Sequence, residues 1–143
     1  MATTRRAPRC VTVSSSISAD MNAVEVDPVA RRARVQAGAT WRNLDNACHA
    51  HGLVVPGGVV SDTGVAGLTL SGGHGWVRRA LGLSCDHVVG FQVVLADGSR
   101  VRADADHHSD LDGALRGGGG FCVVTAFEFD LHPLGPEVFA SRL

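Results

Sequence analysis

The sequence predicts an α+β fold in which helices flank a mostly antiparallel sheet. Three observations lead to this class. Asp97 and Gly98 form a strong hairpin-turn dipeptide between two strand-like segments, which predicts an antiparallel pair of strands. Residues 121–131 alternate in hydropathy, as expected for a strand with one buried face. Between the predicted strands, apolar residues recur at helical spacing over short stretches.

Two short strands come first, at residues 22–27 and 33–38, because both segments alternate apolar and polar residues. A proline-containing turn separates them. A helix should follow from Thr40, a residue type that caps helix N-termini, to Gly52, which ends it. We expect Trp41 to pack into the core from the apolar face of this helix.

The middle of the chain predicts shorter elements. Residues 75–83 show a short helical pattern with Trp76 on its inner side and two arginines on its outer side. Residues 87–96 predict a strand, and residues 99–105 return as its hairpin partner. Ser109 is expected to cap a further short helix, which the following glycine run ends.

The last strand is the clearest in the sequence, and it should divide its side chains between two faces. The residues expected on its apolar face are Phe121, Val123, Thr125, Phe127, Phe129 and Leu131. Two prolines, Pro133 and Pro136, should end this strand because proline cannot donate to a sheet.

The composition limits the classes of function that the protein can have. With 143 residues, 45% of them hydrophobic, the chain can form one domain with a core. A net charge of −1 indicates neither a nucleic-acid nor an acidic membrane partner. No segment approaches the ~20 apolar residues of a membrane span or the apolar core of a signal peptide. The four cysteines are far apart and fit neither a zinc site nor a disulfide framework. We therefore expect a cytoplasmic protein.

The chain is organised around residues 56–86, a stretch that is rich in glycine and apolar at once. Seven glycines lie between Gly57 and Gly75. Glycine lets another group approach the main chain closely, so successive N–H groups can face a bound anion or a flat ring. A cradle for a large ligand and a tightly turned packing loop are both consistent with this pattern. His74 lies inside it, as a ligand contact or as an exposed turn residue.

One cluster of acidic residues and histidines resembles a set of metal ligands. Its members are Asp104, Asp106, His107, His108 and Asp110. They follow a predicted strand and precede a predicted helix, where solvated charges near a helix N-terminus explain them without a metal. We expect no metal site here.

Three blocks of sequence together resemble a known family. Residues 38–76, 81–99 and 114–136 are similar, in order and spacing, to the FAD-binding domain of the FAD-linked oxidase family. That family includes vanillyl-alcohol oxidase, the berberine bridge enzyme, and bacterial oxidases of sugars and alkaloids. The resemblance covers about residues 21–138, and three ordered blocks are far more specific than one glycine motif.

The resemblance implies the second subdomain of a PCMH-type FAD-binding domain, with FAD as cofactor and partner. The complete enzymes pass a hydride from an alcohol or amine carbon to the flavin, and electrons then go to oxygen or another acceptor. Loop amides should run along the pyrophosphate, the ribityl chain and the isoalloxazine edge, and a late strand should lie beside the adenine. The residues expected to contact FAD are Val59, Val60, Ser61, Asp62, Thr63, Gly64, Gly67, Leu68, Thr69, Gly72, Gly73, Gly75, Val123, Val124 and Thr125. No catalytic residue is assigned, because the base normally comes from the substrate domain.

Some positions depart from the family pattern. Val60 stands where some members carry a flavin-linking cysteine, and Leu68 stands where berberine bridge enzymes have a histidine. No histidine precedes His49, so the chain does not support covalent attachment of FAD. The glycine run before Phe121 lacks the usual asparagine, a deletion that can shift the strand entry beside the adenine.

The resemblance also suggests a domain layout. Residues 1–20 should form a divergent tail, for which a short strand and disorder both remain open. Residues 21–138 should form the partial FAD-binding domain, and residues 139–143 lie where a substrate domain would begin. A small-molecule substrate is expected only if such a domain completes the protein. The alternative is an inactive truncated remnant, or a non-enzymatic subunit completed by another chain.

Overall fold

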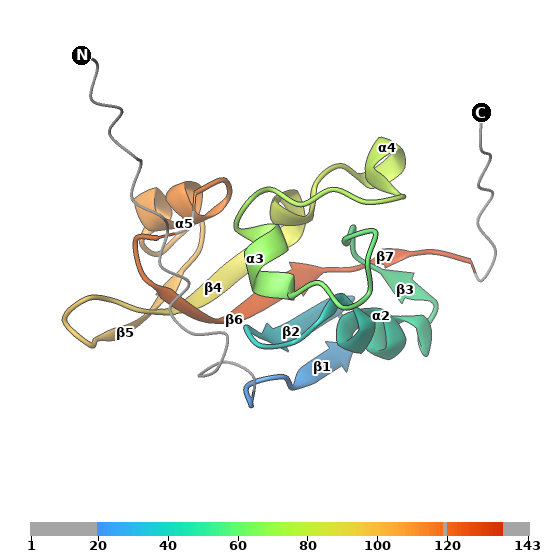
Figure 1. Ribbon diagram of the computed structural model, residues 1–143, viewed down its shortest axis with the longest axis horizontal. Helices are drawn as coiled ribbons and strands as arrows, with labels where there is room; N and C mark the ends of the chain where they lie inside the picture. Colours follow the sequence, from blue (N-terminus) through green and yellow to red (C-terminus); the bar gives the residue numbers. More distant parts are fainter. Residues whose placement is uncertain (1–19, 119, 136–143) are drawn as a thin grey trace, which may run out of the picture.

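The computed structural model describes residues 20–118 and 120–135, and the expectations for residues 1–19, 119 and 136–143 lie outside them. A five-stranded sheet has the order β1-β2-β6-β4-β5, and a two-stranded sheet pairs β3 with β7 (Figure 1). Every pairing is antiparallel, which confirms the predicted fold class. The strands are β1 (Val24–Asp27), β2 (Arg32–Gln36), β3 (Leu53–Val54), β4 (Val88–Val94), β5 (Arg100–Ala103), β6 (Val123–Asp130) and β7 (His132–Pro133).

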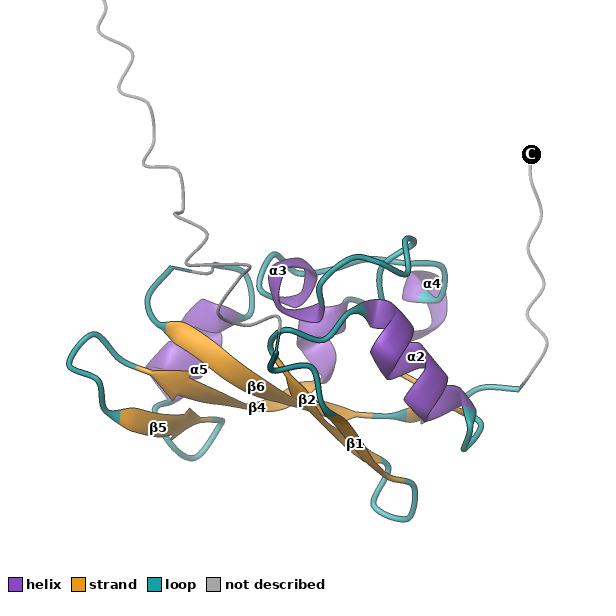
Figure 2. Ribbon diagram, turned by 60° about the horizontal axis from the view of Figure 1, so that its bottom comes forward, coloured by secondary structure: helices purple, strands orange, loops and turns teal. Residues whose placement is uncertain are grey.

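The helices are short and lie in the connections between strands. They are α2 (Trp41–His49), α3 (Val65–Thr69), α4 (Arg78–Leu81), the 3-10 helix η1 (Ser84–His87) and α5 (Ser109–Leu115). Figure 2 shows α2, α3 and α4 on one side of the large sheet, so the apolar core lies between that side and the helices. The opposite side of the sheet carries charged residues.

Helix α2 begins as the sequence predicts. Thr40 has an extended backbone, and its side-chain oxygen accepts a hydrogen bond from the Asn43 amide, while the Asn43 side chain accepts one from the Thr40 amide. This reciprocal capping satisfies two amides that a helix N-terminus otherwise leaves unpaired. Trp41, the first residue of the helix, is fully buried, which confirms the expected core role.

The sheet core is built around aromatic side chains of the two central strands. Phe91 of β4 lies opposite Phe127 of β6, with ring centroids 5.6 Å apart at an angle of 66°. Phe129 stacks beside Phe127, with centroids 5.8 Å apart. Edge-to-face and offset-stacked aromatic pairs add to the stabilisation that burial alone provides.

The predicted face assignment of β6 is wrong in its first half. A register shift between Gln92 and Val93 places Val124, and not Val123, opposite core residue Val93. Val124 is therefore buried, whereas Val123 is 47% exposed and Phe121 is 64% exposed. Such a bulge inserts an extra residue and reverses the faces on one side of it, which strict alternation cannot anticipate.

Two further local expectations are wrong. Trp76 is 79% exposed and precedes α4, which is a single turn of four residues and buries none of them. The helical spacing expected from Trp76 therefore does not apply. Ser109 is the first residue of α5 and not its cap; His108, in the left-handed region at φ 52°, precedes it and accepts the first helical bond from the Asp112 amide.

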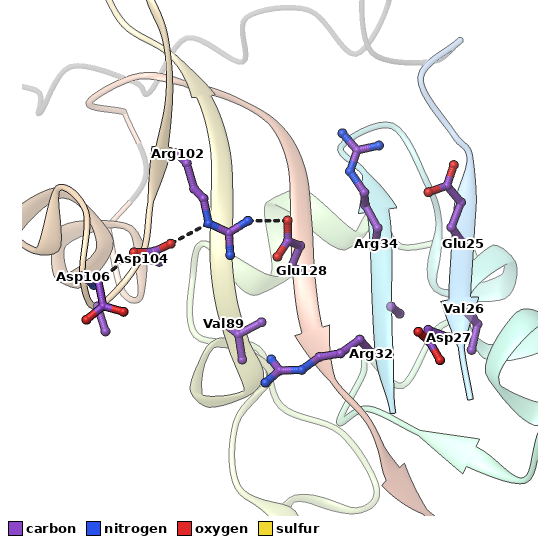
Figure 3. A pocket seen from close by; sticks show the side chains of 12 residues that line it. Glu25, Val26, Asp27, Arg32, Arg34, Val89, Arg102, Asp104, Asp106 and Glu128 are labelled. Atoms are coloured by element: carbon purple, nitrogen blue, oxygen red, sulfur yellow. Dashed lines mark hydrogen bonds and ion pairs between the residues drawn. The ribbon is translucent and has the colours of Figure 1, made fainter. Parts of the chain in front are cut away.

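The charged side of the sheet is held by Arg102, which spans three strands. Its guanidinium pairs with Asp104 and, across β4, with Glu128 (Figure 3). The side chain lies over Gly90, where an added Cβ would be 2.8 Å from Nη2 of Arg102. Glycine at this position thus leaves room for the arginine to cross the strand.

Asp104 should make folding stability dependent on acid pH. Hydrogen bonds from Arg102 and then His107 lower the pKa of its carboxyl group below the ordinary aspartate value. A lowered pKa stabilises the fold above the unfolded-state pKa of about 3.9, and this contribution is lost as the pH falls through the lower folded-state value. Asp104→Asn should therefore lower the urea midpoint at pH 7, by a difference that shrinks steadily below pH ~4.

A matched control is Asp106→Asn, because Asp106 is exposed, lies outside α5, and its side chain makes no hydrogen bond with any residue that the structure describes. We expect that variant to change the midpoint little at either pH. A midpoint difference for Asp104→Asn that stays constant from pH 7 to pH 3 would contradict the proposed role of the carboxylate charge.

Candidate functional site

The glycine-rich loop is attached to the start of α2 by backbone hydrogen bonds. The Trp41 amide donates to the Thr63 carbonyl at 2.9 Å, and the Arg42 amide donates to the Ser61 carbonyl at 2.8 Å. On the other side of the loop, the Val65 amide donates to the Ala39 carbonyl at 2.9 Å. The loop carbonyls therefore face the protein, and they hold the segment between α2 and α3 in place.

The amides of the same loop are left available. Within residues 20–118 and 120–135, no acceptor is found for several consecutive N–H groups. The residues that carry these amides are Val59, Val60, Ser61, Asp62, Gly64, Ala66 and Gly67. Except for Ala66, these residues are exposed, so their amides do not lie in a packed interior. Unpaired N–H groups at one surface can donate to an anion.

The glycines of the stretch fall into two groups. A Cβ added to Gly64 or Gly67 would meet nothing within 4 Å, and neither residue has a positive φ. The protein's own packing therefore does not require glycine at either position. Gly73 and Gly75 differ: a Cβ at Gly73 would lie 2.5 Å from the Ser84 hydroxyl, and one at Gly75 would overlap the Gly57 carbonyl. The packing explanation holds for this second pair.

Several predicted site residues line one open hollow of about 330 Å³. It is formed by Val59, Val60, Thr63, Leu68, Ser71, Gly73 and His74. The structure thus brings the loop and the following glycine segment together. Gly72 lies nearby, in the left-handed region at φ 92°, where glycine is favoured. Thr69, by contrast, is fully buried, and its hydroxyl has no partner among the described residues.

The start of β6 reaches the loop through a shared connection, residues 37–39. The Ala37 amide donates to the Thr125 carbonyl at 3.0 Å, while the Ala39 carbonyl accepts the Val65 amide. Of the three predicted residues of β6, Val123 is exposed, Val124 is buried, and the Thr125 hydroxyl donates to the Gln92 carbonyl at 3.1 Å.

In the acidic cluster after β5, the carboxylate of Asp104 is occupied by internal contacts. Asp104 accepts hydrogen bonds from Arg102, from the amides of Asp106 and His107, and from the His107 ring. Across the part of the chain that the structure describes, no group of three or more His, Cys, Asp or Glu side chains could hold a metal ion. None of the described helices is long and apolar enough to cross a membrane.

A larger hollow of about 510 Å³ lies on the opposite side of the sheet (Figure 3). Its lining includes Arg102, which already pairs with both Asp104 and Glu128. It also includes Glu25 and Arg34, which are cross-strand neighbours. Charges of alternating sign along neighbouring strands are typical of a solvent-facing sheet surface. This hollow contains none of the residues expected to contact a cofactor.

Comparison with known proteins decides the family. Residues 6–104 match the family described as FAD binding domain. The chain belongs to this family. FAD is accordingly the cofactor of this FAD-binding domain, as the resemblance of the three blocks implied.

Individual relatives and solved structures support the same family. The chain is 41% identical over 117 residues to the FAD-linked oxidoreductase pgmH of Aspergillus terreus, covering 81% of this chain and 24% of that protein. The xylooligosaccharide oxidase of Myceliophthora thermophila matches with TM-score 0.79 and 34% identity, over 81% of this chain and 25% of that one. The 6-hydroxy-D-nicotine oxidase of Arthrobacter nicotinovorans matches with TM-score 0.77 and 32% identity, over 79% and 25%.

The comparisons also show how much of each relative this chain matches and which organisms the relatives come from. The FAD-binding domain spans about a quarter of the length of the curated relatives that it matches. The curated relatives are mostly fungal, so they do not support a bacterial-type oxidase, although the family that the sequence resembles includes bacterial oxidases.

The loop geometry fits FAD. The FAD diphosphate is an anion, and the loop offers it exposed amides without an internal acceptor. The ring and ribityl chain need a surface without protruding side chains, and Gly64 and Gly67 would supply one that the fold itself does not need. The sequence predicted contacts at these residues but gave no indication of Arg42, whose guanidinium contacts the loop at Asp62.

Proposed function

We propose that the loop from Val59 to Thr69 holds FAD mainly through main-chain amides, in an oxidoreductase that oxidises an alcohol or amine carbon. When bound, FAD supplies the redox chemistry, accepting a hydride and passing electrons to oxygen or another acceptor. The residues of this chain bind and orient the cofactor. The observation that carries the proposal is the set of exposed amides in this loop that have no acceptor among the described residues. Two of these amides belong to Gly64 and Gly67, where packing does not require glycine.

The remaining expected contacts are assigned by position. The hollow beside Leu68 and Gly73 would receive the flat ring, since it opens next to the amide-bearing loop. Exposed Val123, at the start of β6, would support the adenine. Gly72 and Gly75 would act indirectly, because they fix the backbone on either side of Gly73 and His74, which line the hollow.

The substrate class is proposed from chemistry and from the matched proteins. One of them is named as an oxidase of a xylooligosaccharide, which carries alcohol groups, and another as an oxidase of 6-hydroxy-D-nicotine, which carries an amine. The inactive-remnant alternative is not favoured, since the aligned relatives are named as oxidoreductases and monooxygenases.

Valine at Gly64 or Gly67 tests the binding mode. Each substitution adds a side chain where the protein has open space, so the urea midpoint and far-UV circular dichroism should match those of the wild type. The same side chain would stand where FAD approaches the amides, and we expect at least about tenfold weaker binding, or about 1.4 kcal/mol. Quenching of FAD fluorescence during titration measures this affinity.

Gly135→Val is the matched control, because Gly135 also has open space around it but lies after β7 and does not line the hollow beside the loop. It should leave both stability and FAD affinity unchanged. Equal FAD affinity for all three valine variants and the wild type would show that the cofactor does not contact this loop.

A further inference from the structure

Asp62 introduces a negative charge into a loop that otherwise carries none. Between residues 57 and 73 it is the only Asp, Glu, Lys or Arg in the sequence. Its carboxylate is 78% exposed, and its own amide is among those without an internal acceptor. A carboxylate beside amides that receive a diphosphate should repel the ligand, because like charges at short range oppose binding.

Arg42 cancels this charge. Its Nη2 lies 2.8 Å and its Nε 3.2 Å from the same oxygen of Asp62, Oδ1. Its amide also donates to the Ser61 carbonyl, so Arg42 contacts two adjacent loop residues, one through the backbone and one through the side chain. The backbone of Arg42 is thus held beside the loop by a contact that does not depend on the ion pair itself.

The ion pair is poorly explained as a stabiliser of the fold. Its two side chains are 60% and 78% exposed, and pairs that are open to solvent contribute little to stability. The position of the ion pair is more informative than its strength. Arg42 brings the net charge of the loop from −1 to zero at the place where an anion is expected.

We propose that Arg42 is a positioning residue that compensates the charge of Asp62 and so permits the loop to accept the diphosphate of FAD. This rests on the proposed binding mode. Arg42 acts by neutralising a neighbour. A merely structural role would make a different prediction, because both partners of an ion pair are equally necessary to a contact that only ties the loop to α2.

The test compares FAD affinity for Arg42→Gln, Asp62→Asn and the double variant, by fluorescence quenching at low ionic strength. Charge compensation predicts that the two single variants change FAD affinity in opposite directions. Arg42→Gln should weaken binding about threefold to tenfold, Asp62→Asn should tighten it about twofold to fivefold, and the double variant should bind like the wild type. Raising the salt concentration to ~0.5 M should remove most of both single effects.

Arg32→Gln is the matched control, since Arg32 lines the hollow on the opposite side of the sheet (Figure 3) and forms a partly exposed pair with Asp130. It should leave FAD affinity unchanged. If Asp62→Asn weakens binding as much as Arg42→Gln does, the contact ties the loop down and charge compensation is wrong. If wild-type protein does not quench FAD, the binding mode itself fails, and this inference fails with it.

Discussion

Replacing Gly75 by alanine should destabilise the protein more than any other single methyl addition in the glycine-rich stretch. Gly75 is buried, and its added Cβ would overlap the backbone carbonyl of Gly57. A backbone atom cannot rotate away as the end of a side chain can, so two segments of the chain must separate. Overpacking of this kind costs typically 1–3 kcal/mol and sometimes more; we expect about 3 kcal/mol, measured as a lower urea midpoint.

Gly113→Ala provides the control for this prediction. Gly113 lies within α5, is exposed, and has open space where its Cβ would be. Alanine there should stabilise the protein by about 0.5–1 kcal/mol, because it restricts the unfolded chain and favours the helix. A Gly75→Ala variant as stable as the wild type would mean that the segments at Gly57 and Gly75 are not in close backbone contact.

The contrast between glycines shows what sequence can and cannot predict. Composition identified the stretch as special, but a glycine in a sequence does not reveal what surrounds it. Gly73 and Gly75 serve packing, whereas a Cβ added at Gly64 or Gly67 would meet no other atom within 4 Å. The packing explanation therefore holds at Gly73 and Gly75, whereas the cradle explanation stays a prediction at Gly64 and Gly67. Only the distances between segments separate the two groups.

Local signals predicted the elements well where the cause is local. The Thr40 cap and the hairpin at Asp97 depend on neighbouring residues, and both were predicted. The bulge near Val93 depends on the register between two distant strands, so the face of Val123 was assigned wrongly. The ion pair of Arg42 joins residues twenty positions apart, and no pattern in the sequence indicates such a contact.

The two tryptophans differ in burial in a way that their local sequence does not show, and Trp41 is the site of the second large predicted loss of stability. Trp41 is fully buried, with its ring centroid 6.4 Å from that of Phe129, and its indole lies directly beneath Gly57 and Gly58. It therefore supports the loop from below while it fills the core. Trp41→Ala should lower the free energy of unfolding by about 3–5 kcal/mol, and FAD affinity should fall as the unsupported loop loses its conformation.

Trp76→Ala makes the same chemical change at an exposed side chain and should shift the free energy of unfolding by no more than about 0.5 kcal/mol. Trp41→Phe should recover much of the lost stability, because it retains a ring and removes an indole N–H that has no partner among the described residues. Urea titration of the three variants gives the order directly. A larger loss for Trp76→Ala than for Trp41→Ala would show that the core is centred on the other tryptophan, and the loop would then lack the support on which cofactor binding depends.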